Sequence, residues 1–252
     1  MAEIAGCPIV ENIRLTDTAY AITMRAVGIA GHARAGQFVH VNCGHRRILR
    51  RPISICGADG DLIKIVFEAR GEGTRWLAAR RAGQSLDVLG PLGHGYDLSG
   101  ENIIVLGGGI GVPPMLFAAK SAPGSVTAIL GFRGSGKILL KEEFEATCKK
   151  VYITTDDGSF GIAGAVTLPL EKLLESGGYT AVLACGPRPM LKAAADLCAR
   201  FDITCQVSLE ERMGCGIGAC FVCACKTEKN GEESMSRVCK DGPVFDAREV
   251  VW

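Results

Sequence analysis

The stretch Met213-Gly-Cys-Gly-Ile-Gly-Ala-Cys-Phe-Val-Cys-Ala-Cys225 contains a C-x4-C-x2-C pattern, and a later cysteine stands at position 239. This is the plant-type spacing of a 2Fe–2S cluster held by four thiolates. Gly214, Gly216 and Gly218 allow the positive φ angles and the close backbone approach that a loop around a small inorganic core requires. A zinc site would instead show two C-x-x-C-like pairs. The predicted cluster ligands are Cys215, Cys220, Cys223 and Cys239.

The composition limits the class of protein. The 252 residues suffice for two compact domains or one large one, and the net charge of +1 gives no electrostatic case for binding nucleic acid. The first residues lack the basic and apolar regions of a secretion signal. We find no uncharged apolar run of about 18 residues, so we expect no transmembrane helix. Twelve cysteines without a signal peptide indicate a reducing compartment, and we expect a cytoplasmic protein.

The first hundred residues predict a small antiparallel barrel. Apolar residues alternate with polar ones in short runs, without intervening helices. Asp59-Gly60 is typical of a hairpin turn. One helical insertion is expected over 74–81, with Thr74 as its N-cap. The expected strands are 20–27, 37–42, 51–56, 61–67 and 86–89.

Two segments of this barrel have the chemistry of phosphate binding. Arg51-Pro-Ile-Ser54 offers a guanidinium, which can bind phosphate through two hydrogen bonds. Gly71-Glu-Gly-Thr74 offers glycine-rich backbone just before a helix, where N–H groups are free to bind a pyrophosphate. Alone, the first is equally a surface charge and the second an ordinary turn. Together, in this order, they resemble the flavin-binding barrel of the ferredoxin–NADP reductase superfamily.

From residue 103 the pattern changes to strands that alternate with helices, which predicts a doubly wound nucleotide-binding domain. The boundary with the barrel is expected near 97–101. Gly107, Gly109 and Gly111 follow the first strand with GxGxG spacing, which departs from the strict dinucleotide fingerprint but still predicts phosphate binding at a strand–helix turn. The expected strands are 103–106, 126–130, 151–154, 180–185 and 204–208, and the expected helices are 116–120, 141–148, 165–175 and 190–200.

Cys185 ends a predicted strand of this domain, at the sheet edge where ligands gather in open α/β folds. The segment Cys185-Gly-Pro-Arg-Pro-Met190 resembles the reductase superfamily, in which this cysteine lies near the nicotinamide. Plain core packing is the structural alternative. The choice between NAD and NADP stays open, because no acidic residue stands in Gly131-Phe-Arg-Gly-Ser135, where one would indicate NAD.

Nearly the whole chain is similar to one family, the electron-transfer (PyrK-type) subunits of dihydroorotate dehydrogenase B, which are iron–sulfur flavoproteins of the same superfamily. The most specific resemblance is in the cysteine segment. The similar segments are 50–54, 90–93, 107–115, 155–159, 210–220 and 237–245.

The resemblance implies a fold, three cofactors and a partner. The fold is an antiparallel flavin-binding barrel over 1–98, an α/β NAD-binding domain over 99–208 and a 2Fe–2S domain over 209–252. Cys225 is implied to be a neighbour of the cluster and not a ligand. FAD is implied at Arg51, Pro52, Ile53, Ser54, Val66, Phe67, Glu68, Gly73 and Thr74, and NAD at Gly107, Gly109, Gly111 and the catalytic Cys185.

The implied partner is a catalytic subunit that carries FMN and oxidises dihydroorotate in pyrimidine (UMP) biosynthesis. Electrons would pass from that FMN through the cluster and FAD to NAD⁺, in a heterotetramer with two copies of each subunit. Two alternatives remain. One is the flavin subunit of an NAD(P)H-dependent ferredoxin reductase, sulfide dehydrogenase or hydrogenase complex. The other is a redox-sensing protein without turnover, which Arg51, Gly73 and Thr74 argue against.

Overall fold

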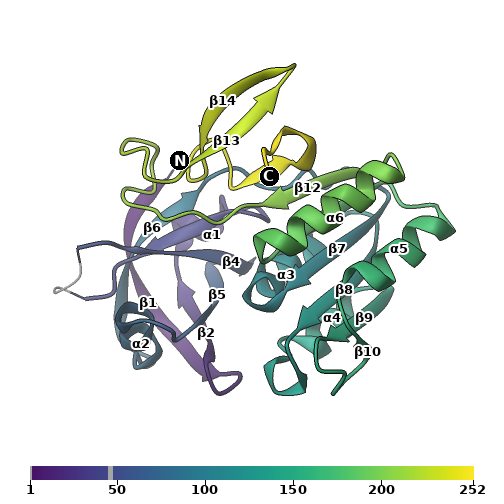
Figure 1. The fold of residues 1–252 in the computed structure, drawn as a ribbon. Coiled ribbons are helices and arrows are strands. Elements are labelled where there is room, and N and C mark those ends of the chain that lie inside the picture. Colours follow the sequence, from purple (N-terminus) through teal and green to yellow (C-terminus); the bar gives the residue numbers. More distant parts are fainter. Residues whose placement is uncertain (1, 45–47) are drawn as a thin grey trace.

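The computed structural model describes residues 2–44 and 48–252, and it begins with a closed antiparallel barrel (Figure 1). The strands follow one another around the barrel in the order β1-β2-β5-β4-β3-β6. They are β1 (Glu3–Arg14), β2 (Ala19–Arg25), β3 (Phe38–Val41), β4 (Arg51–Asp59), β5 (Leu62–Glu68) and β6 (Ser85–Leu92). The expected barrel is therefore confirmed, and so is the hairpin at Asp59-Gly60, which joins the paired strands β4 and β5.

Two parts of the barrel differ from expectation. The strand β1 was not predicted, because only Cys7 and Ile9 are buried along it and its pattern does not alternate regularly. The helical segments are α1 (Val27–Ala30) and α2 (Glu72–Ala78), so the predicted single insertion was incomplete. Thr74 is wrong as an N-cap: Gly71 caps α2, and the Thr74 hydroxyl accepts a hydrogen bond from the Gly71 N–H at 3.2 Å.

The second half of the chain forms the predicted sheet of alternating strands and helices. The sheet order is β10-β9-β8-β7-β11-β12-β15, and every pair is parallel except β12 with β15. The strands are β7 (Asn102–Gly108), β8 (Ser125–Phe132), β9 (Lys150–Thr155), β10 (Ile162–Ala163), β11 (Ala181–Cys185), β12 (Thr204–Ser208) and β15 (Val244–Asp246). The helices are η1 (Gly109–Gly111), α3 (Val112–Ser121), η2 (Ser135–Lys137), α4 (Lys141–Thr147), α5 (Thr167–Ser176) and α6 (Arg188–Arg200).

The helix α3 joins the barrel to the sheet. Its residues from Val112 to Ala119 are all buried, because it packs on β7 of the sheet and on β4 of the barrel. The helices α5 and α6 pack together on the other face, as seen at the right of Figure 1. The glycine turn η1, which precedes α3, is thereby brought into contact with β5 of the barrel.

The C-terminal segment leaves the sheet and returns to it. After β12 the chain runs back over the top of the barrel in Figure 1, then forms the hairpin of β13 (Ala224–Lys229) and β14 (Glu232–Arg237). It ends with β15 and the short turn η3 (Ala247–Glu249). Across the described ranges, none of the helices has the length and apolar character needed to cross a bilayer.

Candidate functional site

The four predicted cluster ligands lie in the loop between β12 and β13 and in the turn after β14, and they form two pairs. The Cys215 N–H donates to the Cys220 Sγ at 3.4 Å, and the two thiol groups also contact each other. The Cys239 N–H donates to the Cys223 Sγ at 3.5 Å, again with contact between the thiols. The loop therefore presents two cysteine pairs.

Backbone N–H groups converge on these sulfurs. Ile217 and Ala219 donate to the Cys215 Sγ at 3.4 and 3.3 Å, and Gly218 donates to the Cys239 Sγ at 3.1 Å. Burial alone would raise the pKa of Cys215, but the N–H groups around its sulfur lower this pKa to about 6. Such donors stabilise negative charge on sulfur, whether on a thiolate or on a cluster ligand.

The second pair has the opposite electrostatics. Burial and the neighbouring Cys223 thiol raise the pKa of Cys239 to about 12. A thiol in this position becomes a thiolate at neutral pH only when a bound cation compensates its charge. The two pairs together thus match a site that is completed by metal.

Glycines shape the loop, in two different ways. Gly216 and Gly218 have φ angles of +74° and +84°, as predicted. Gly214 has no positive φ, but it shows the expected close approach: a Cβ there would lie 3.1 Å from the Cys220 Sγ, so the missing side chain leaves space for the sulfur. Arg237 stabilises the loop by donating a hydrogen bond from its guanidinium to the Gly218 carbonyl at 3.1 Å.

The donor set has the type and number of ligands that a two-iron cluster needs. In a 2Fe–2S cluster each iron takes two protein thiolates and shares the bridging sulfides. Two cysteine pairs with N–H donors around them meet that requirement.

The two predicted flavin segments meet in the structure. Arg51 begins β4, and its side chain lies against Gly73 in α2, where a Cβ would be 3.0 Å from the Arg51 Nε. The Arg51 Nη1 donates to the Leu49 carbonyl at 2.7 Å, which fixes the side chain. The structure therefore places a guanidinium against the glycine turn, as binding of a pyrophosphate requires.

The other predicted flavin residues differ in what they expose. Pro52 is exposed and Ser54 is half-buried, whereas Ile53 is buried. Val66 and Phe67 on β5 are also buried. The remaining flavin residues are polar or lie in the turn: Glu68 forms an ion pair with Arg70, and Thr74 bonds to Gly71.

The two nucleotide motifs also meet. Gly107 on β7 pairs with Cys185 on β11, so both motifs lie at the carboxyl edge of the sheet. Gly111 approaches so closely that an added Cβ would overlap the Cys185 carbonyl. The turn with Gly109, whose φ is +53°, thus lies directly beside the end of β11.

We expect Gly111→Ala to destabilise this contact. The new Cβ would collide with backbone atoms of Cys185, which cannot move aside as a flexible side chain would. The expected cost is about 1–3 kcal/mol, seen as a lower melting temperature together with weaker NAD binding. Gly136→Ala is the matched control, because its added Cβ meets no atom within 4 Å. Equal melting temperatures for both variants would contradict the packing described for Gly111.

Cys185 is a buried, neutral thiol. Burial raises its pKa to about 12, and the Glu210 carboxylate adds to this effect while Ser208 opposes it. Tyr96 lies nearby and donates its hydroxyl to the Ala184 carbonyl at 2.9 Å. The thiol can therefore pack against a bound ring but cannot serve as a base. Sequence reasoning missed these neighbours, because they converge from distant segments.

His40 is a second residue that sequence reasoning missed. It lies on β3, is fully buried, and neither ring nitrogen has a hydrogen-bond partner among the described residues. Burial, with Arg50 close by, lowers its pKa to about 4, so the ring is neutral. A single histidine in an alternating strand gives no signal of this environment.

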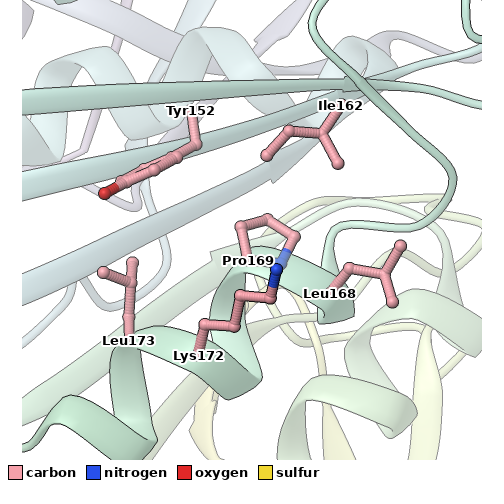
Figure 2. A pocket seen from close by; sticks show the side chains of 6 residues that line it. All are labelled: Tyr152, Ile162, Leu168, Pro169, Lys172 and Leu173. Atoms are coloured by element: carbon pink, nitrogen blue, oxygen red, sulfur yellow. The ribbon is translucent and has the colours of Figure 1, made fainter.

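A small apolar hollow lies elsewhere, between β9, β10 and α5 (Figure 2). Figure 2 shows Tyr152 and Ile162 on the sheet facing Leu168, Pro169, Lys172 and Leu173 on the helix. None of the predicted site residues lines it. It is therefore separate from the site described above.

Comparisons with known proteins agree with this geometry. Residues 210–251 match the family model of the iron–sulfur cluster binding domain of dihydroorotate dehydrogenase B. The chain is 38% identical, over 97% of both chains, to the electron transfer subunit of dihydroorotate dehydrogenase B (NAD⁺) from Caldanaerobacter subterraneus. It is 41% identical to the corresponding subunit from Bacillus pumilus, over 96% of both chains.

A solved structure extends the similarity to three dimensions. It belongs to an NADH-dependent reduced ferredoxin–NADP oxidoreductase that carries out flavin-based electron bifurcation, and the two chains are 28% identical with a TM-score of 0.88. The match covers 100% of the present chain and 92% of the other. The whole fold of the present chain thus occurs in a protein of related architecture.

Proposed function

This chain belongs to the family of electron transfer subunits of dihydroorotate dehydrogenase B (NAD⁺), and from that premise we propose that it passes electrons from the FMN of a catalytic partner to NAD⁺. It is thus an NAD-linked flavin iron–sulfur oxidoreductase subunit that serves pyrimidine biosynthesis. When bound, the cluster moves single electrons and FAD converts them into the hydride that NAD⁺ accepts.

The residues would divide this work. Cys215, Cys220, Cys223 and Cys239 would hold the cluster. Arg51 and the Gly73 turn would bind the FAD pyrophosphate, and the buried Cys185 thiol would pack against the nicotinamide. The glycines of η1 would admit the NAD phosphates, since no side chain blocks their N–H groups. One observation carries the proposal. Two cysteine pairs, whose sulfurs accept hydrogen bonds from backbone N–H groups, lie in a segment that packs on the barrel.

We prefer NAD over NADP because of Asp157. This carboxylate lies directly against Gly134, just after β8. The segment 131–135 at the end of β8 contains no acidic residue of its own. Asp157 comes instead from the end of the neighbouring strand β9, and it accepts a hydrogen bond from the Ser159 N–H at 2.9 Å. A carboxylate here would bind a ribose hydroxyl and repel a 2′-phosphate.

The partner would dock at the outer face of the cysteine loop. Ile217, Phe221 and Val222 are each more than half exposed there, next to the exposed Cys220. Grouped apolar side chains on a surface are typical of a protein interface. Following the resemblance, we propose a cytoplasmic heterotetramer with two copies of each subunit.

We also propose three functional domains: residues 1–98 for FAD, 99–208 for NAD and 209–252 for the cluster. The barrel ends with β6 at Leu92 and the sheet begins with β7 at Asn102, which supports the first boundary. The second boundary is functional only, because β15 from the last segment pairs with β12 of the sheet.

Purification of the tagged chain from its native cells tests the proposal. We expect an FMN-containing subunit that oxidises dihydroorotate to co-purify with it, and NAD⁺ reduction that depends on both subunits. The similarity to a reduced ferredoxin–NADP oxidoreductase supports a second candidate, a ferredoxin reductase subunit. Co-purification with a large iron–sulfur subunit that is active with ferredoxin, without dihydroorotate oxidation, would establish that candidate instead.

A further inference from the structure

The buried imidazole of His40 has no role in the function proposed so far. It is fully buried, and both ring nitrogens lack a hydrogen-bond partner within residues 2–44 and 48–252. The Cys215 backbone lies close enough to raise the pKa of the ring, although the contact does not have the distance and angle of a hydrogen bond. Buried polar groups in proteins are nearly always bonded, because an unmade hydrogen bond costs free energy. The ring is therefore expected to find its partner in a group that binds beside it.

His40 lies on the outer surface of the barrel, next to the flavin strand. Successive side chains of a strand face opposite sides, so Val39 and Val41 fill the barrel while Phe38 and His40 point outward. His40 pairs directly with Pro52 on β4. Directly paired residues share a face of the sheet, which places the imidazole beside the segment proposed to hold FAD.

The cysteine loop covers the other side of the ring. A Cβ on Gly216 would lie 2.6 Å from the His40 Nδ1, so even an alanine would collide with the imidazole. Gly216 follows the cluster ligand Cys215 directly and has a φ of +74°. The ring is thus enclosed between the cluster loop and the flavin strand, with Nδ1 on the side of the loop.

Burial keeps the ring neutral by lowering its pKa, and the nearby Arg50 adds to this effect. Arg50 donates to the His40 carbonyl at 3.3 Å and holds the Asp87 carboxylate with two hydrogen bonds of 2.9 and 2.8 Å. The Asp87 carboxylate is thereby already paired with Arg50. A neutral imidazole carries one N–H donor and one acceptor nitrogen.

We propose that His40 is a positioning residue that donates its Nδ1–H to the cluster at the Cys215 side and so raises the reduction potential of the cluster. Hydrogen bonds to cluster sulfur stabilise the reduced form, which carries the extra negative charge. The inference rests on the proposed function, since it requires a bound 2Fe–2S cluster. In this proposal His40 lies between the cluster and strand β4, which is proposed to hold FAD, and contacts both.

The test compares two substitutions at this position. His40→Phe keeps a planar ring but removes both nitrogens, and His40→Asn returns an amide N–H near the position of Nδ1. We expect both variants to retain iron and FAD. The midpoint potential of the cluster, from a titration followed by electron paramagnetic resonance, should become more negative in His40→Phe and return toward the parent value in His40→Asn. His32→Phe, at an exposed histidine on the barrel surface, should leave it unchanged.

A second measurement does not depend on the stability of any variant. The chain has only four histidines, so labelling them with ¹⁵N gives a simple pulsed spectrum of the reduced cluster. We expect one weak ¹⁵N coupling from histidine in the parent protein. Its absence, or equal potentials in the parent and His40→Phe, would overturn the inference while leaving the proposed function intact. A parent protein without iron would instead contradict the proposed function itself.

Discussion

The variant Cys220→Ser is expected to lose the cluster and keep FAD. Cys220 is exposed at the rim of the loop and forms one pair with Cys215. A serine hydroxyl stays protonated at neutral pH, so the variant would offer only three thiolates, and iron content should fall from about two per chain to nearly none. The proposed FAD residues lie on β4, on β5 and in the first turn of α2, so flavin content should not change. Iron assay and visible absorption measure both cofactors in one sample.

Cys225→Ser provides the matched control for this variant. Cys225 is in the same segment but is buried on β13, and we do not assign it as a ligand. The variant should keep its full iron content and absorption spectrum. Loss of iron in Cys225→Ser together with retention in Cys220→Ser would show that the ligand set is wrong. Zinc in the parent protein, or four irons per chain, would exclude a 2Fe–2S cluster altogether.

The variant Arg51→Ala is expected to weaken FAD binding by about 10- to 100-fold, because a hydrogen-bonded charged group contributes roughly 1.5–3 kcal/mol. The guanidinium lies against Gly73, so its removal takes away the positive charge beside the proposed pyrophosphate site. The cluster loop does not contain Arg51, and iron content should stay at the parent level. Fluorescence titration of the flavin-free protein with FAD measures the dissociation constant.

Two further substitutions interpret that measurement. Arg51→Lys keeps the charge but loses the planar fork, so it should bind FAD with an affinity between those of the parent and the alanine variant. Arg25→Ala removes an exposed arginine that pairs with Asp61, the residue before the neighbouring strand β5, and it should bind FAD normally. An unchanged dissociation constant in Arg51→Ala would remove Arg51 from the flavin site.

Local patterns in the sequence predicted most of the architecture. The alternating residues of β2 to β5 and the Asp59-Gly60 turn are short-range signals, and they predicted the barrel correctly. The C-x4-C-x2-C spacing is also local, since a tight loop must bring those thiols together. The strand β1 was missed because Gly6 and Pro8 interrupt it and much of it is exposed.

The long-range contacts could not be predicted in this way. The closeness of His40 to Gly216 joins positions far apart in the chain, and no local pattern around His40 indicates it. Asp157 reaches the end of β8 from β9, so a search along a single strand finds no acidic residue there. The residues around Cys185 likewise come from separate segments. Such contacts depend on how the elements pack, which only the three-dimensional structure provides.

The strand β15 has a consequence for how the protein conducts electrons. The segment with the cysteines begins where β12 ends, and it returns to pair with β12 through Val207 and Phe245. Both ends of this segment are therefore fixed in one sheet, unlike the ends of a mobile carrier domain on a flexible linker. The distances between the cofactor sites in this chain should accordingly stay fixed during electron transfer. The rate of electron transfer should therefore be insensitive to solvent viscosity.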